Sequence, residues 1–152
     1  MSDRTNTRKQ DRIKELVGNF NSFESRRDHI LFNYQFLTSG EEYGQSFEDW
    51  DRERIILDLN NKLKDFSGKK KVDLISEGVL CIYGAFPAKS KFKYPPSLPK
   101  DNGKAQWARL SITGRRRVIG FFTPGSDRES DVFYVVFLDE GHEFYPAEKK
   151  HT

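Results

Sequence analysis

The clearest hydrophobic pattern lies in the second half of the chain, where apolar runs follow one another at short intervals. These runs are rich in β-branched and aromatic residues, which favours strands over helices. The last run is apolar at both alternating positions, which predicts an inner strand covered on both faces. The predicted strands are Val79 to Tyr83, Lys104 to Ile112, Arg116 to Thr123 and Val132 to Leu138.

Apolar residues recur at helical spacing in the first half of the chain. The clearest case runs from Phe47 to Phe66, with Ser46 as an N-cap and acidic residues in the first turn. Shorter helices are predicted from Arg8 to Phe20 and from Lys71 to Ser76. The aromatic run from His29 to Leu37 fits either a strand or a buried helix.

The order of these elements predicts an α+β fold in which N-terminal helices pack on a small antiparallel sheet of about four strands. Residues 46–152 are expected to form this domain. Residues 1–45 are expected to form an N-terminal extension with a helix, and the pattern leaves open whether the extension joins the core. Prolines interrupt residues 87–103, which predicts a long loop between strands.

Composition supports one folded domain. Hydrophobic residues make up 36% of the 152 residues, and 13 phenylalanines supply bulk for a core. Every apolar run is shorter than the roughly 18 residues of a membrane span, so no membrane association is expected. A single cysteine, Cys81, favours a reducing, cytoplasmic setting.

Charge is distributed unevenly along the chain, although its net value is only +3. Residues 86–117 hold nine basic residues against one acid, Asp101, whereas residues 41–58 hold seven acids against two arginines. Basic residues interleaved with aromatic rings favour contact with RNA phosphates and unpaired bases. A solvated loop beside core aromatics explains the pattern equally well. The candidate RNA contacts are Lys89, Lys91 and Lys93 in the predicted loop, with Lys104, Arg109 and Arg116 on the predicted strands.

Three consecutive arginines open the third predicted strand. Strand alternation places Arg115 and Arg117 on one face and Arg116 on the other, with Arg109 one strand back. Two guanidinium groups on one face match the oxygens of a phosphate. The alternative is a charged hairpin end that prevents edge-to-edge pairing.

A short polar run follows the last predicted strand. His142 can transfer a proton near neutral pH, and Tyr145 can donate a hydrogen bond or act as a base. Asp139 either orients His142 or forms a turn, and Tyr145 is alternatively a core ring. The chain lacks phosphate-binding glycine motifs and a histidine–cysteine set for zinc, so neither a cofactor nor a metal is expected.

The order of helices, arginine-bearing strands and a terminal His/Tyr pair resembles the RelE/ParE superfamily of bacterial toxins. The resemblance covers about residues 49–146 and rests on RRRVIGFF, VFYVVFLD and HEFYP. It implies metal-free cleavage of mRNA on the ribosome and an antitoxin protein as partner. It also implies that Arg109, Arg115 and Arg117 hold the phosphate and that His142 and Tyr145 act as acid and base. Lys91 and Lys93 would make auxiliary contacts.

Two other classes of function fit the same residues. One is a non-enzymatic protein-binding module of phage or mobile-element origin, in which the strands and the acidic helix contact a partner. The other is a nucleic-acid-binding regulator that uses only the basic segment.

Overall fold

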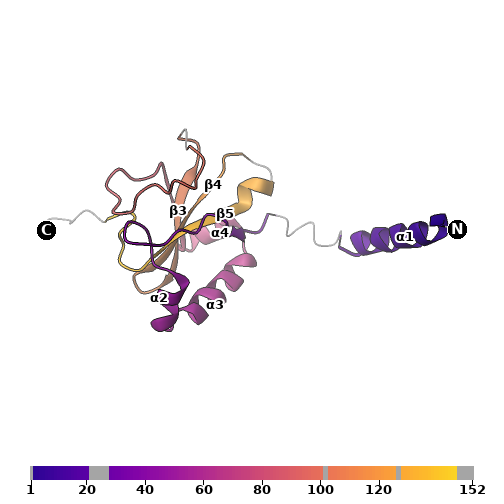
Figure 1. The fold of residues 1–152 in the computed structure, drawn as a ribbon, viewed down its shortest axis with the longest axis horizontal. Coiled ribbons are helices and arrows are strands. Elements are labelled where there is room, and N and C mark those ends of the chain that lie inside the picture. Colours follow the sequence, from indigo (N-terminus) through magenta and orange to yellow (C-terminus); the bar gives the residue numbers. More distant parts are fainter. Residues whose placement is uncertain (1, 21–27, 101–102, 126–127, 147–152) are drawn as a thin grey trace.

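A five-stranded mixed sheet forms the centre of the molecule (Figure 1). The computed structural model describes residues 2–20, 28–100, 103–125 and 128–146. The strands lie in the order β1-β5-β4-β3-β2, and only β1 and β5 are parallel. Their bounds are Leu31–Asn33 (β1), Leu80–Gly84 (β2), Gln106–Thr113 (β3), Arg116–Phe122 (β4) and Val132–Asp139 (β5). The predicted α+β class is confirmed.

The four predicted strands are present and pair antiparallel, but the sheet as a whole is mixed and not antiparallel throughout. The sheet has five strands instead of about four, because part of the ambiguous run from His29 to Leu37 pairs with β5. Leu31 aligns with Val132 and Asn33 aligns with Tyr134, so the added strand is parallel. A strand of three residues is too short for its alternation to be distinguished from a buried helix.

Three short helices follow β1: α2 (Phe47–Arg52), α3 (Ile56–Ser67) and α4 (Lys71–Ser76). Ser46 begins α2 through a capping box with Asp49, which confirms the predicted N-cap. The single helix predicted from Phe47 to Phe66 is wrong, because the chain turns between α2 and α3. Arg54 adopts a left-handed φ of 63° there, which ends the helical path.

The sheet separates two hydrophobic clusters. On one face, α3 and α4 bury Leu59, Leu63 and Leu74 against the strands. On the other face, loops take the place of helices and bring aromatic rings onto the sheet. The inner strand β5 is buried between the two clusters, as its sequence predicts. The loop-covered cluster contains Phe92, Leu98, Trp107, Ile119, Phe121, Val136, Phe137 and Phe144.

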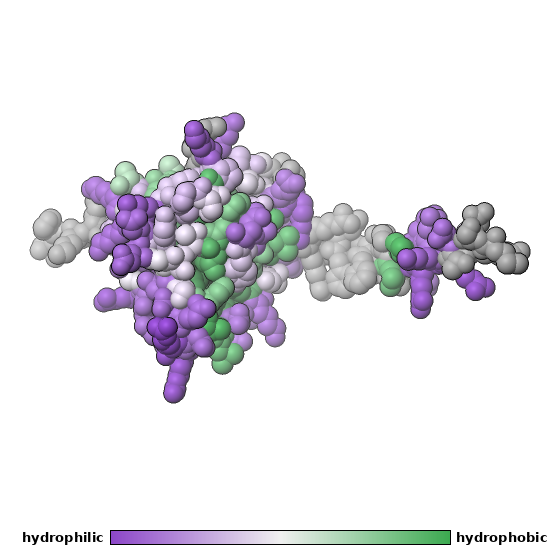
Figure 2. All heavy atoms as spheres, in the orientation of Figure 1, coloured by the Kyte–Doolittle hydropathy of each residue, from purple (hydrophilic) through white to green (hydrophobic). Residues whose placement is uncertain are grey.

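Helix α1 (Ser2–Phe20) lies apart from the sheet and the other helices (Figure 1). Its side chains from Asn6 to Leu16 are all exposed. Ile13 and Leu16 are 51% and 54% exposed and contribute to the hydrophobic patch on this helix in Figure 2. The side chains of Val17 and Phe20, which belong to the same predicted stripe, lie outside the described residues.

The described part of the expected N-terminal extension that follows α1, residues 28–45, packs against the core. Ile30 is completely buried in the helix-covered cluster, and Phe36 packs against the loop-covered one. Among the described helices, none combines the length and apolar character required to cross a membrane.

Candidate functional site

Two arginines project from neighbouring strands on the loop-covered face of the sheet. Arg109 aligns with Ile119, and Ser111 aligns with Arg117, so alternation directs all four side chains to that face. Arg109 Nη1 donates to Ser111 Oγ at 2.6 Å. Arg117 Nη1 donates to the carbonyl oxygen of Gly114 at 2.8 Å. Neutral partners therefore orient both guanidinium groups.

This arginine pair carries positive charge that the described residues do not neutralise by ion pairing. Neither Arg109 nor Arg117 forms a salt bridge with another described residue. The Nε of Arg117 is buried without a hydrogen-bond partner. Burial and the nearby charge of Arg109 lower the pKa of Arg117. A bound anion would compensate the charge of both guanidinium groups.

The loop that follows β5 is organised by the buried carboxylate of Asp139, which is 1% exposed. Asp139 Oδ1 accepts hydrogen bonds from the backbone N–H groups of Gly141 and Glu143 at 3.3 and 3.0 Å. Oδ2 accepts the N–H of Phe144 at 3.0 Å. Asp139 thus has the turn-forming role that the sequence offered as an alternative.

The same loop places His142 beside the arginines. Its backbone is left-handed, with a φ of 57°, and its side chain is partly buried. Partial burial and the charges of Arg117, Arg109 and Arg115 lower the pKa of His142, and Asp139 opposes this effect. The imidazole is therefore neutral near pH 7 and able to accept a proton.

Tyr145 forms the outer wall of the site together with a residue that sequence reasoning missed. Its ring stacks on Tyr83 at a centroid distance of 4.4 Å and an interplanar angle of 8°. Tyr145 is 50% exposed, so it is not a core ring. Burial raises the pKa of Tyr83, whereas Arg109 opposes the rise. Both tyrosines line a hollow of about 410 Å³ that Phe86 and Lys89 also border.

The sequence alone does not identify Tyr83, because its place beside Arg109 depends on the register between β2 and β3. Cys81 aligns with Arg109, and the register shifts between Ile82 and Gly84. Tyr83 lies at this irregularity and packs against the loop-covered cluster.

The other two arginines of the triplet do not share the position of Arg117. Arg115 lies in the exposed turn before β4, close enough for its charge to affect His142. Arg116 forms ion pairs with Glu53 at 2.9 Å and Glu140 at 3.5 Å. Arg116 is thus engaged by carboxylates, whereas Arg109 and Arg117 are not.

The predicted lysine contacts lie on the loop that covers the arginine-bearing face. Lys89, Lys91, Lys93 and Lys104 are all exposed. The Lys91 N–H donates to the carbonyl oxygen of Glu143 at 2.9 Å, which ties this loop to the one that carries His142. Lys93 Nζ forms an ion pair with Glu42 at 2.6 Å. Asp101, the single acid of the basic segment, lies outside the described residues.

Within the described ranges, no group of three or more His, Cys, Asp or Glu side chains could hold a metal ion. The chain matches no protein-family model, no curated protein and no solved structure. The candidate site is therefore defined by its own geometry: two inward-facing arginines, a neutral histidine and a stacked tyrosine pair.

Proposed function

We propose that the protein is a metal-independent endoribonuclease of the RelE kind, acting on mRNA in association with the ribosome. The observation that carries the proposal is the pair Arg109 and Arg117, which lie on one face of the sheet, are oriented by neutral partners and form no ion pair with described residues. The charges of both arginines also act on His142. RNA supplies both a phosphate for the guanidinium groups and a 2′-hydroxyl for the imidazole.

The proposed reaction needs only these side chains. His142 removes the proton from the 2′-hydroxyl, whose oxygen attacks the adjacent phosphorus. The bond from phosphorus to the 5′-oxygen breaks, and Tyr145 donates a proton to that leaving oxygen. The products are a 2′,3′-cyclic phosphate and a 5′-hydroxyl. Arg109 and Arg117 bind the non-bridging oxygens, on which negative charge increases in the transition state.

The proposal extends to the partners that the resemblance implies. Arg115 lies at the exposed hairpin turn, where it would contact the RNA next to the scissile phosphate. Lys89 and Lys91 are exposed on the adjacent loop and would follow the strand. An antitoxin protein that covers this basic surface would suppress the activity by excluding RNA.

Substitutions at the site test the proposed reaction. We expect Arg117→Ala and His142→Ala each to slow cleavage of single-stranded mRNA by about 100-fold or more, the usual effect of removing a general base or an oxyanion donor. Tyr145→Phe should slow it in the same direction. Arg116→Ala is the matched control, because its guanidinium pairs with Glu53 and Glu140, and it should retain activity. Cleavage is measured on purified RNA in the presence of EDTA, which tests the independence from metal, and separately on translating ribosomes in a buffer that contains magnesium.

Two results contradict the proposal. A triple variant at Arg117, His142 and Tyr145 that cuts as fast as the parent excludes these residues from catalysis. A parent protein that leaves RNA and ribosomes intact excludes the reaction itself. Retention of a protein in pull-down would then favour a non-enzymatic binding module, and steeply salt-dependent RNA binding without product would favour a regulator.

A further inference from the structure

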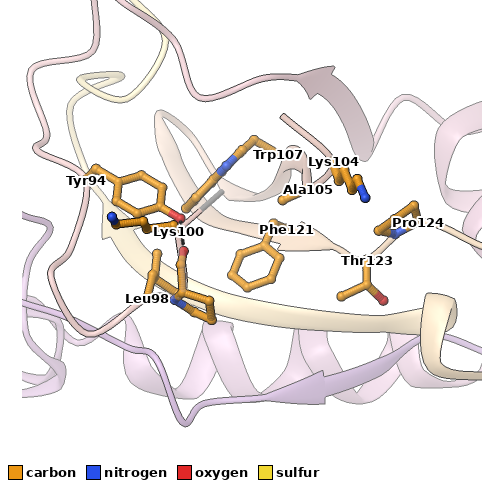
Figure 3. Close-up of a pocket in the computed structure, with 10 residues that line it drawn as sticks. Tyr94, Leu98, Lys100, Lys104, Ala105, Trp107, Phe121, Thr123 and Pro124 are labelled. Atoms are coloured by element: carbon orange, nitrogen blue, oxygen red, sulfur yellow. Dashed lines mark hydrogen bonds between the residues drawn. The ribbon is translucent and has the colours of Figure 1, made fainter. Parts of the chain in front are cut away.

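A second hollow lies on the same face of the sheet as the arginine pair, at the far end of β4. Its volume is about 210 Å³, below the roughly 300–1,000 Å³ of pockets that take a drug-sized ligand. It is therefore suited to a single ring system. The lining residues are Tyr94, Leu98, Pro99, Lys100, Lys104, Ala105, Trp107, Phe121, Thr123 and Pro124 (Figure 3).

Packed aromatic rings give this hollow a fixed shape. Trp107 and Phe121 lie beneath it, with ring centroids 5.3 Å apart. Tyr94 forms a wall and contacts Trp107 edge-on at a centroid distance of 6.1 Å. The Tyr94 hydroxyl donates to the carbonyl oxygen of Pro99 at 2.7 Å, which fixes the tyrosine ring. A guest ring would therefore enter a site that is already formed, at little entropic cost.

The rim of the hollow carries positive charge. Figure 3 shows Lys100 on one side, next to Tyr94, and Lys104 on the other, next to Pro124. Both lysines are exposed. An apolar slot with cations at its edge matches a nucleotide, whose base is flat and whose phosphate is anionic.

The register of the sheet relates this hollow to the arginine site. Trp107 aligns with Phe121, and Ser111 aligns with Arg117, so the two sites lie four residues apart on β4. That separation corresponds to roughly 13 Å along the strand at about 3.3 Å per residue. The loop after β2 covers the part of the sheet between the two sites. Phe92 of this loop is buried, whereas Lys91 and Lys93 are exposed.

We infer that this hollow binds one unpaired base of the RNA strand whose scissile phosphate lies at Arg109 and Arg117. The inference rests on the proposed function and specifies its substrate as single-stranded RNA several nucleotides long. A base within a duplex is stacked and paired, so it cannot enter the hollow without leaving the helix. Lys91, which is exposed on the loop between the two sites, lies where the connecting phosphates would pass.

Filling the hollow tests the inference. Thr123→Trp places a ring in the space that the base would occupy, and Thr123→Val is the matched control of nearly equal volume. The probes are an all-2′-deoxy octanucleotide, which cannot be cut by 2′-hydroxyl attack, and the corresponding dinucleotide. We expect Thr123→Trp to weaken octanucleotide binding about 5- to 150-fold, as expected for one lost base–aromatic stack. Dinucleotide binding, which reaches only the arginine site, should be unchanged.

A second variant covers the case in which the tryptophan perturbs folding. Lys100→Ala should weaken octanucleotide binding several-fold and reduce its salt dependence, whereas Lys100→Arg should resemble the parent. Circular dichroism of each variant establishes that it is folded before binding is compared.

Three outcomes would overturn the inference. The Thr123→Trp variant binds the octanucleotide as tightly as the parent, or the parent does not bind the octanucleotide at all. In the third outcome, proline- or aromatic-rich peptides occupy the hollow and RNA does not displace them. Failure of the proposed function is seen in the cleavage assay. Either the parent protein does not cut RNA, or substitution of Arg117 and His142 does not change the rate of cleavage. The two failures are therefore distinguished by separate assays.

Discussion

At the residue scale, the chemistry of the candidate site depends on the charges around His142. Three arginines and partial burial disfavour the imidazolium, and Asp139 compensates only in part. Because the carboxylate of Asp139 accepts three backbone N–H groups, it holds the loop in place while the arginine charges remain available to an anion.

Phosphate should reverse the depression of the His142 pKa. We expect inorganic phosphate, or a nucleotide that occupies the arginine site, to raise this pKa toward its ordinary value, because the anion offsets the guanidinium charges. Arg117→Ala should raise it without ligand. The measurement is an NMR titration of the His142 ring protons, with His29 as the internal control. If neither phosphate nor Arg117→Ala changes the pKa of His142, the arginines do not influence its protonation.

The same shift determines how stability depends on pH. The pKa of His142 is lower in the folded protein than in the unfolded chain, where it is about 6.5. The unfolded state therefore binds more protons as the pH falls below that value, and the free energy of unfolding decreases. Bound phosphate should reduce this loss.

Part of the site follows from the sequence because strand alternation is a local property. Alternation alone separates Arg117 from Arg116, and the structure shows Arg116 paired with Glu53 and Glu140. The position of Tyr83 depends on the register between β2 and β3, which a single sequence does not reveal. The aromatic hollow likewise depends on how the loop after β2 folds back over the sheet.

At the element scale, β4 depends on the absence of a side chain at Gly120. The register between β4 and β5 shifts between Ile119 and Gly120. A Cβ at Gly120 would overlap the carbonyl oxygen of Tyr134 and lie 2.8 Å from atoms of the Phe133 ring. Glycine is therefore required at this irregularity between β4 and β5.

Gly120→Ala should destabilise the fold by about 3 kcal/mol, because the added methyl group can be accommodated only by moving β5. Gly68→Ala is the matched control. Its φ of −88° suits alanine, and the nearest atom to the new Cβ is the carbonyl oxygen of Asp65 at 3.6 Å. That variant should be unchanged or slightly more stable. Urea denaturation measures both, and equal midpoints for the two variants would contradict the role of Gly120.

The elements differ in how far their sequences specify them. Helix α4 has its predicted bounds, and β5 is the predicted buried strand, since their patterns are local and strong. The break between α2 and α3 is not encoded by glycine or proline. Arg54 adopts its left-handed conformation because Trp50 and Ile55 are both buried, and a continuous helix would not direct both into the core.

At the scale of the whole molecule, helix α1 and the sheet domain form separate parts. The described side chains of α1 are exposed, and Figure 1 shows the helix away from the sheet. Its stripe of Ile13 and Leu16 therefore does not contribute to the core.

Deletion of residues 1–20 should leave the thermal stability of the sheet domain unchanged within about 2 °C, because α1 buries little surface on folding. The melting temperature is measured by calorimetry on the full chain and the shortened one. Leu59→Ala is the positive control, since Leu59 is 1% exposed beneath the sheet and its truncation should cost about 2–5 kcal/mol. A large loss on deletion would show that α1 docks on the domain.

The parallel pairing of β1 with β5 has a consequence for biosynthesis. β1 precedes the other strands in the chain, yet its neighbour in the described sheet is β5, the last of the five to be translated. Phe32 therefore has no partner strand until Phe133, about a hundred residues later in the chain, has been translated, and such long-range closure is slow. Since His142 follows β5, the proposed nuclease cannot assemble its site while the sheet is still incomplete.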